Sequence, residues 1–438
     1  MPADVQENIA DIEDLGALCA IYDKWQGNPA DKYTPKEQFA IMRALYKNQR
    51  YRDCLNLYRS CRSAYPAYGN LNNYMGWSVY RVYFVPLKEA KFQAREWQKQ
   101  CDRLCRQAGY VLKNVDRGQY SPVWKIVDNL TEALMKGRIT PAADYARALY
   151  WLKMLDPAQL DTAEISYVDQ DGKARSLASP REVWYSRAVK CLFQLKEYEE
   201  CIRLGEQLWA HPFTNKFHNN RDCWIKYCMS KSYIALGKLP EAAEIARKVA
   251  SSFPNWNFYG LLCEVAMQQD NMEEFHKYAG CTALADKSHQ MRIKIYAQMA
   301  DFLHQHGQIR EALLHRKLVA NLYAENNWTQ KKGKAIEFPH DIAGMSTKDV
   351  LKELKILWQQ WQDAGKEFRE GTIERILPNG GSGFIKAENG ESYYFNFRDA
   401  KCKQAFLQPG SRVKFVLIDR MDKKKNQMKK NAIDIRSL

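Results

Sequence analysis

The sequence lacks an apolar run of about 18 residues, the length that marks a membrane-spanning helix. Its first residues, MPADVQENIADIEDLG, are acidic and contain no basic segment followed by an apolar one. A secretory signal needs both of these parts, so we predict none. These two absences favour a cytoplasmic protein.

The twelve cysteines include no Cys-x-x-Cys pair, the spacing most typical of zinc sites and redox motifs. Cys101 and Cys105 are four residues apart, and Cys223 and Cys228 are five apart, each pair within a helical pattern. A reduced cytoplasmic cysteine usually packs as a small apolar residue. We therefore expect buried thiols and no metal site.

Familiar catalytic motifs are missing as well. No glycine-rich loop leads to a lysine followed by serine or threonine, and no His-Glu-x-x-His occurs. His304 and His306 are two residues apart and face different ways on a helix, while His211 and His218 have no acidic residue close in sequence. Folding could still assemble a site from distant residues. We expect a protein that is not an enzyme and needs no cofactor.

The length and the charge distribution indicate more than one domain. A chain of 438 residues exceeds one ordinary hydrophobic core. Residues 371–438 carry 14 Lys and Arg against seven Asp and Glu, which is +7 of the chain's +15. A basic segment is typical of a module that binds polyanions, although many solvated domains are also basic.

A helix, a polar turn and a second helix recur along most of the chain. The stretch ALYKNQRYRDCLNLYRSCRSAYP, 44–66, has this layout, with its apolar residues on one helical face. The residue near the start of each second helix can be aligned at Cys54, Cys201, Ala242, Phe275 and Ala312, and the last four are 41, 33 and 37 residues apart. This resembles the tetratricopeptide repeat, whose period is about 34 residues. The resemblance implies a solenoid of helical hairpins with a groove for a protein partner.

Two segments interrupt the repeats. Residues 161–180 contain Asp171-Gly172, which favours an inserted loop or a small hairpin. Residues 327–346 lack a helical period, and a helix is expected from Thr347, its N-cap. One face of that helix should carry Val350, Leu354, Leu357 and Trp361. We expect it to cap the repeats or to fasten the tail to them.

The tail resembles the cold-shock domain, a five-stranded barrel of the oligonucleotide-binding class. GTIERI, 371–376, lies where the family has Gly-Thr-Val-Lys-Trp-Phe, and GGSGFI, 380–385, lies at its Lys-Gly-Phe-Gly-Phe-Ile. YYFNF, 393–397, takes the place of Val-Phe-Val-His-Phe, and LQPGSRVKF, 407–415, resembles Leu-x-x-Gly-x-x-Val-x-Phe. The chain is thus predicted to be multidomain: a mainly α solenoid over 1–326, a loop and linker or capping helix over 327–370, and an all-β barrel over 371–438.

The resemblance implies a nucleic-acid site, although several family positions have changed. Arg375 replaces the family's tryptophan and Ser382 its first motif aromatic, while Phe384, Tyr394 and Phe397 are retained. Alternation along a strand places Tyr393 and Phe395 on the face opposite Tyr394. The residues expected to bind nucleic acid are Phe384, Tyr394, Asn396, Phe397, Arg375, Lys386, Lys423, Lys424, Lys425, Lys429 and Lys430.

Two functions fit this organisation. The first is a non-enzymatic adaptor whose barrel binds single-stranded RNA or DNA and whose repeats bind a protein partner. The alternative is a protein-interaction scaffold whose barrel no longer binds nucleic acid. The basic tail and YYFNF favour the adaptor, while the aromatics lost at Arg375 and Ser382 favour the scaffold.

Overall fold

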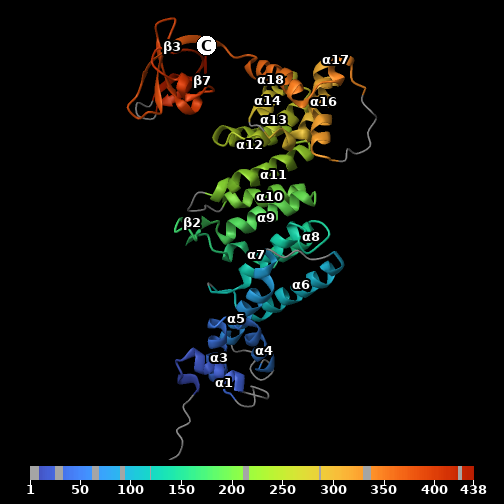
Figure 1. The fold of residues 1–438 in the computed structure, drawn as a ribbon, viewed down its shortest axis with the longest axis vertical. Helices are drawn as coiled ribbons and strands as arrows, with labels where there is room; N and C mark the ends of the chain where they lie inside the picture. The colour runs from blue at the N-terminus through green and yellow to red at the C-terminus, as the bar shows by residue number, and fades with distance from the viewer. Residues whose placement is uncertain are drawn as a thin grey trace, which may run out of the picture. The chain divides into compact units, whose positions relative to one another are not determined.

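The computed structural model describes residues 9–24, 33–61, 69–88, 94–118, 120–210, 217–285, 288–328, 337–422 and 427–438. The chain forms two compact units, Met1–Val265 and Ala266–Leu438. Along the chain, a long helical region is followed by a closed five-stranded barrel, which confirms the predicted fold class (Figure 1). No helix within the described ranges is long and apolar enough to cross a membrane.

The described part of the first unit is helical except for one small hairpin. Its helices are α1 (Leu15–Lys24), α3 (Pro35–Lys47), α4 (Tyr51–Cys61), α5 (Gly69–Val79), α6 (Trp97–Asn114), α7 (Val123–Met135), α8 (Tyr145–Lys153), α9 (Pro180–Gln194), α10 (Tyr198–Ala210), α11 (Arg221–Ala235) and α12 (Leu239–Ser252). Helix α5 continues into a π-helical turn, Tyr80–Phe84. Helix α13 (Trp256–Gln268) spans the division between the units. The expected insertion is the antiparallel pair β1 (Ile165–Val168) and β2 (Ala174–Leu177), which confirms a hairpin at 161–180.

Five of the described helical hairpins, those with an aligned residue, close through one type of turn. After the first helix, one residue adopts positive φ: Gln49 (60°), Lys196 (64°), Gly237 (73°), Asp270 (55°) or Gly307 (73°). The N–H of the next residue bonds to the carbonyl five positions earlier, as from Arg50 to Leu45 at 2.8 Å and from Lys238 to Tyr233 at 2.9 Å. This is the Schellman pattern, which satisfies carbonyls at a helix end.

The repeat alignment is confirmed by burial. Five residues after each positive-φ residue lies the aligned residue of the second helix, and each is fully buried: Cys54, Cys201, Ala242, Phe275 and Ala312. Two of them make matching contacts, since the Sγ of Cys54 and of Cys201 each donate at 3.5 Å to a carbonyl twelve residues earlier. All twelve cysteines are free thiols, and eight of them are buried.

The helices of the second unit are α14 (Met272–Leu284), α15 (Ile293–Gln305), α16 (Ile309–Glu325), α17 (His340–Ala343) and α18 (Thr347–Asp363). The expected helix after 346 exists and packs against α14 and α16. Two details of its prediction are wrong. Its N-cap is Ser346, because the carboxylate of Asp349 completes a capping box with that residue. The buried stripe contains Trp358, while Leu357 is only half-buried.

Trp358 is the centre of the core that α18 shares with its neighbours. Its ring stacks on Tyr296, with centroids 5.5 Å apart, and its Nε1 donates to Nε2 of His315 at 2.9 Å. Complete burial lowers the pKa of His315 to about 4. The imidazole is therefore neutral at physiological pH and can accept from the indole.

The barrel consists of β3 (Phe368–Ile376), β4 (Ser382–Ala387), β5 (Ser392–Asn396), β6 (Arg412–Asp422) and β7 (Gln427–Ser437). The strands close in the order β3-β4-β5-β7-β6, with β5 and β7 parallel and the other neighbours antiparallel. Phe395 and Phe415 are fully buried in the interior with Ile373, Ile385 and Ala432 around them. The expected alternation is confirmed, because Tyr393 and Phe395 face inward and Tyr394 does not.

Charged groups join the last strand of the barrel to the end of α18. Arg436 donates to both carboxylate oxygens of Asp363, at 2.6 and 2.7 Å, and also to Asp434. Lys366 donates to Asp434 at 2.6 Å. Partial burial raises the pKa of Asp363, but hydrogen bonds from Arg436 and Gln359 outweigh it and leave this pKa below its usual value.

Candidate nucleic-acid interface

Three predicted site residues form one row across the outer face of the barrel. Strand pairing sets Arg375 of β3 opposite Phe384 of β4, and Phe384 opposite Tyr394 of β5. Directly opposed residues on neighbouring strands have Cβ atoms about 5 Å apart. Arg375, Phe384 and Tyr394, here called the outer row, therefore form a continuous surface.

The side chains of the outer row contact one another. The Arg375 guanidinium carbon lies 4.9 Å from the centre of the Phe384 ring, a cation–π contact. The Phe384 and Tyr394 rings meet edge to face, with centroids 5.8 Å apart. Arg375 is exposed and both rings are half-buried, so part of each ring faces solvent.

A β-bulge decides which charge joins the row. The register between β3 and β4 shifts by one residue between Ile373 and Arg375. Without that extra residue, Glu374 would lie opposite Phe384, so the bulge places a cation there instead of an acid. A glycine makes room for it, because a Cβ on Gly383 would lie 2.5 Å from the carbonyl oxygen of Arg375.

The other predicted residues near the row have more than one role. Lys386 is exposed on β4, two residues beyond Phe384 and hence on the same face. The Asn396 side chain accepts from the N–H of Arg398 at 2.9 Å and so caps the short 3-10 turn Phe397–Asp399. Phe397 stacks on buried Phe395, with centroids 5.7 Å apart, and so joins the edge of the core instead of the row.

The five predicted lysines of residues 423–430 divide into three groups. Lys429 is exposed two residues before Asn431, which pairs with Tyr394, so alternation places Lys429 on the face of the outer row. Lys430 is exposed and points to the other face by the same rule. Lys423, Lys424 and Lys425 lie outside the described residues.

An acid lies within electrostatic range of Lys430. Hydrogen bonds from Tyr393 and Asn389 lower the pKa of Glu391, and the charges of Arg369 and Lys430 lower it further. Glu391 is therefore ionised at neutral pH and offsets part of the positive charge of Lys430. Lys386 and Lys429 lie on the face of the outer row and are the candidates there for phosphate contacts.

Ser382 shows what the platform has lost. It pairs with Asn396, is almost completely buried, and donates to the side chain of Asn379 at 3.0 Å. At the position where the cold-shock domain has an aromatic, this chain thus has a small residue that closes a turn. Two rings and one guanidinium plane remain available to stack on bases.

Among the described residues, no group of three or more His, Cys, Asp or Glu side chains could hold a metal ion. The two rings and the guanidinium of the outer row are suited to binding by stacking and charge. No protein-family model matches the chain and a search of curated proteins finds no significant match, so the candidate interface rests on its own geometry.

Proposed function

We propose that the chain is a non-enzymatic adaptor whose barrel binds single-stranded RNA or DNA and whose helical hairpins bind a protein partner. The observation that carries the proposal is the outer row, in which the register of three strands brings Arg375, Phe384 and Tyr394 together. The barrel interior alone does not require an arginine and two aromatic rings to be aligned on the outer face.

The strength of such binding follows from the two rings. Stacking of a base on an aromatic side chain contributes about 1–3 kcal/mol. Two half-exposed rings with cations around them give moderate affinity that depends on salt, because each neutralised phosphate releases counterions. Unpaired bases are required, since a base within a duplex has no free face to stack on these rings.

The barrel supports a cold-shock-like assignment. A closed five-stranded barrel with one parallel pair is the arrangement of the oligonucleotide-binding class. Members of this class bind single strands on an outer face, and the retained Phe384 and Tyr394 lie on such a face. The family's mode of binding therefore fits the residues that remain.

The hairpins support a tetratricopeptide-like assignment for the body. The support comes from the repeated Schellman turn and the buried residue five positions after it. Arrays of such hairpins leave a groove that takes a peptide or a helix. The protein partner in this proposal would occupy that groove.

The barrel proposal is tested by titrating the full chain with a fluorescein-labelled single-stranded 20-mer, as RNA and as DNA. Phe384→Ala and Tyr394→Ala should each weaken binding by about 1–3 kcal/mol, roughly 5- to 150-fold, with little change in salt dependence. Phe406→Ala is the matched control, because Phe406 is a half-exposed aromatic of the 3-10 turn Gln404–Phe406, which belongs to none of the three strands of the row. Changing Lys423, Lys424 and Lys425 together to alanine should reduce the slope of log affinity against log salt by about 0.7 per lost contact.

The scaffold remains a second candidate because buried Ser382 has replaced one stacking group. It predicts that Tyr394→Ala and Phe406→Ala bind nucleic acid equally, or that the wild-type chain shows no binding that depends on the barrel. Either result would contradict the stacking platform and favour the scaffold.

A further inference from the structure

A second basic surface lies in the helical body, on α6. The helix carries Lys99, Arg103, Arg106 and Lys113 against a single acid, Asp102. These four cations, here called the α6 stripe, recur at three-, four- and seven-residue intervals and so share one helical face. All four are exposed, and the opposite face is buried through Cys101, Leu104, Ala108 and Val111.

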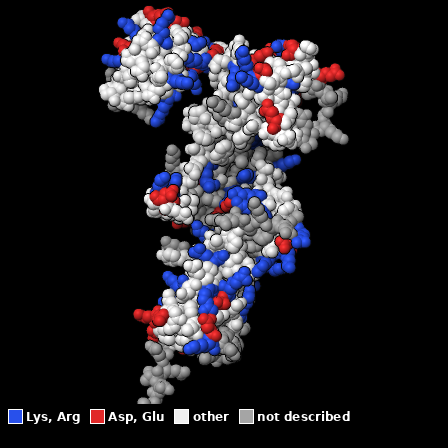
Figure 2. Space-filling view, in the orientation of Figure 1, with Lys and Arg blue, Asp and Glu red and all other residues white. Residues whose placement is uncertain are grey.

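Charge pairing distinguishes the α6 stripe from several other charged helix faces of the body. Some cations there pair with acids one turn away on the same helix, as Lys136 does with Glu132 and Lys226 with Asp222. Within the described part of the chain, none of the four α6 cations makes an ion pair. Asp102 accepts instead from Gln98 at 2.8 Å. Figure 2 shows Lys and Arg side chains gathered over the region that Figure 1 labels α6.

The spacing of the stripe suits a chain of regularly placed anions. An α-helix of 18 residues is about 27 Å long, and its turns rise by about 5.4 Å. Cations at successive turns therefore meet an extended polyanion at several points, whereas a single small anion would occupy only one.

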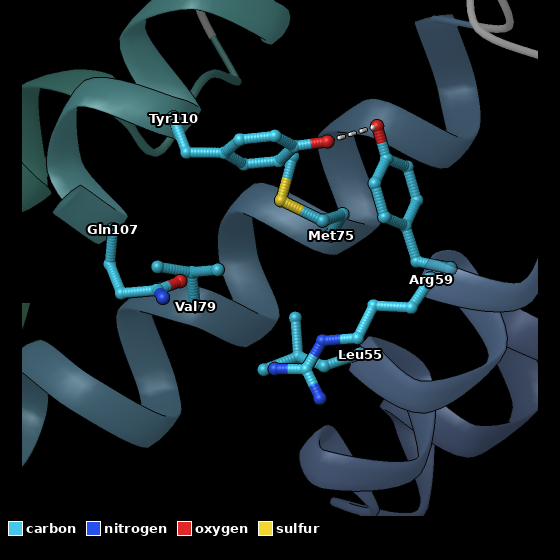
Figure 3. Close-up of a pocket in the computed structure, with 7 residues that line it drawn as sticks. Leu55, Arg59, Met75, Val79, Gln107 and Tyr110 are labelled. Carbon is cyan, nitrogen blue, oxygen red and sulfur yellow. Dashed lines mark hydrogen bonds between the residues drawn. The ribbon is translucent and has the colours of Figure 1, made fainter. Parts of the chain in front are cut away.

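A small cavity lies beside the stripe and favours a nucleic acid over other polyanions. It has a volume of about 170 Å³ and lies between α4, α5 and α6 (Figure 3). Leu55, Met75 and Val79 form its apolar lining, while Arg59 and Gln107 add a guanidinium and an amide. An apolar slot with polar groups at its edge accepts a planar base, whose edge bonds to the amide.

Aromatic rings accompany the cations. The Arg103 guanidinium carbon lies 4.7 Å from the centre of the Tyr83 ring. Tyr110 of α6 lines the cavity, and its hydroxyl donates to the hydroxyl of Tyr58 at 3.3 Å (Figure 3). Cations with interleaved aromatic rings are the pattern of single-strand binding surfaces, whereas a polyglutamate segment or an anionic lipid surface needs only the charge.

We propose that the helical body has its own binding site for single-stranded nucleic acid: the α6 stripe holds the phosphates, and the cavity lined by Arg59 and Gln107 takes one base. This site goes beyond the barrel interface and does not depend on it. A chain with two such contacts would hold one strand more tightly than either contact alone if the strand reaches both.

The test uses the full chain and a fluorescein-labelled single-stranded 20-mer, as RNA and as DNA. The stripe variant changes Lys99, Arg103, Arg106 and Lys113 to glutamine, a good helix former. The charge-matched control changes the exposed residues Lys153, Lys190, Lys196 and Lys238 to glutamine. Both are also made with Phe384→Ala and Tyr394→Ala, and each variant is checked for unchanged circular dichroism and melting temperature.

The stripe variant should bind more weakly and reduce the salt slope by about 0.7 per lost phosphate contact. For four contacts, the affinity ratio of wild type to variant should fall about 50-fold between 50 and 200 mM salt. The charge-conserving variant Arg103→Lys, Arg106→Lys should keep the salt slope of the wild type. A stripe variant that behaves like the charge-matched control overturns the proposal.

The base cavity and the class of polyanion are tested with two further arms. Gln107→Met should weaken single-strand binding about two- to tenfold with no change in slope, since it removes a hydrogen bond and no charge. If the chain binds a duplex of the same sequence as tightly as the single strand, the proposal that the cavity takes a base is wrong. Polyglutamate that competes as well as an unlabelled oligonucleotide of equal charge overturns the nucleic-acid assignment and indicates an acidic protein partner.

The two proposals fail in distinguishable ways. If the stripe variant binds like its charge-matched control while Phe384→Ala and Tyr394→Ala still weaken binding, only the body site is refuted. If Phe384→Ala and Tyr394→Ala leave binding unchanged while the stripe variant still weakens binding in that background, only the barrel interface is refuted.

Discussion

Two neighbouring aromatics of β5 should respond to truncation in opposite ways. Phe395 is fully buried in the barrel and Tyr394 is half-buried on its outer face. We therefore expect Phe395→Ala mainly to destabilise the fold of the barrel and Tyr394→Ala mainly to weaken its binding.

The magnitudes follow from this burial. Truncation of a buried phenylalanine to alanine costs about 3–5 kcal/mol. A barrel of about 70 residues has a stability of roughly 3.5–10 kcal/mol, so Phe395→Ala removes much or all of it. Tyr394→Ala loses its edge-to-face contact with Phe384, worth about 0.5–1.5 kcal/mol. Binding should instead fall by about 1–3 kcal/mol per base stacked on Tyr394.

The assay must report on the barrel separately from the helices. All twelve tryptophans precede residue 371, the last being Trp361, so tryptophan fluorescence reports only on the helical regions. Hydrogen exchange followed by mass spectrometry reports on peptides that cover β4 and β5. In Phe395→Ala, their exchange through global opening should accelerate by about a hundredfold to several thousandfold, because 1.4 kcal/mol is a factor of ten.

One result would refute the assignment of faces. If Phe395→Ala left exchange in β4 and β5 unchanged while Tyr394→Ala opened the barrel, the alternation would be inverted. The outer row would then be part of the interior.

Three further perturbations test other contacts. Gly280→Ala should lower the free energy of unfolding by about 1–3 kcal/mol, because the new Cβ would lie 2.6 Å from the carbonyl oxygen of Trp358. Urea melts followed by tryptophan fluorescence measure this loss, and an unchanged midpoint would contradict the close approach of α14 and α18. Gly237→Ala should cost about 1–2 kcal/mol in the same assay, since φ is +73° there, and a neutral effect would argue against the Schellman turn. Burial raises the pKa of Asp363, but the hydrogen bond from Arg436 outweighs it and leaves this pKa lowered, so the stability that the pair contributes is present above the unfolded pKa of about 3.9 and is lost as pH falls through the lower folded value. Hydrogen exchange of β7 should therefore accelerate as the solution is acidified, and Asp363→Asn should abolish this acceleration. An identical acid profile in the variant would show that the pair does not stabilise the strand.

The sequence predicted the hairpins well because their signal is local and repeated. Each of the aligned residues, from Cys54 to Ala312, is buried at the same distance after a turn. The alignment succeeded without a shared turn residue, since two of the five aligned turns have glycine at the positive-φ position, Gly237 and Gly307, and three do not. Periodic burial is therefore a stronger signal here than the identity of the turn residue.

Details that depend on a choice between adjacent residues were not predictable in this way. Ser346 and Thr347 are both good N-caps, and the choice depends on the carboxylate that Asp349 supplies to the capping box. Leu357 and Trp358 both fit an apolar stripe, and packing against Tyr296 and His315 selects the tryptophan.

The sequence suggested residues for the candidate interface but not their geometry. Phe384 and Tyr394 were identified by resemblance, yet the partner of Phe384 depends on a bulge that no local pattern in GTIERI indicates. The α6 stripe had a sequence signal, the three-, four- and seven-residue spacing of Lys99, Arg103, Arg106 and Lys113. That these cations make no ion pair among the described residues can be seen only in the folded chain.

The pairing of β7 has a consequence for the order in which the chain folds. Each helical hairpin is completed by residues close in sequence, and contacts of this kind form in microseconds to milliseconds. The barrel instead needs β7 to pair with β6 and also, in parallel, with β5, where Tyr394 meets Asn431. Because this closure is non-local, the interior around Phe395 stays open until β7 has paired. We therefore expect refolding to show a fast helical phase in tryptophan fluorescence and a slower barrel phase in pulse-labelled hydrogen exchange, with the outer row able to bind only after the second.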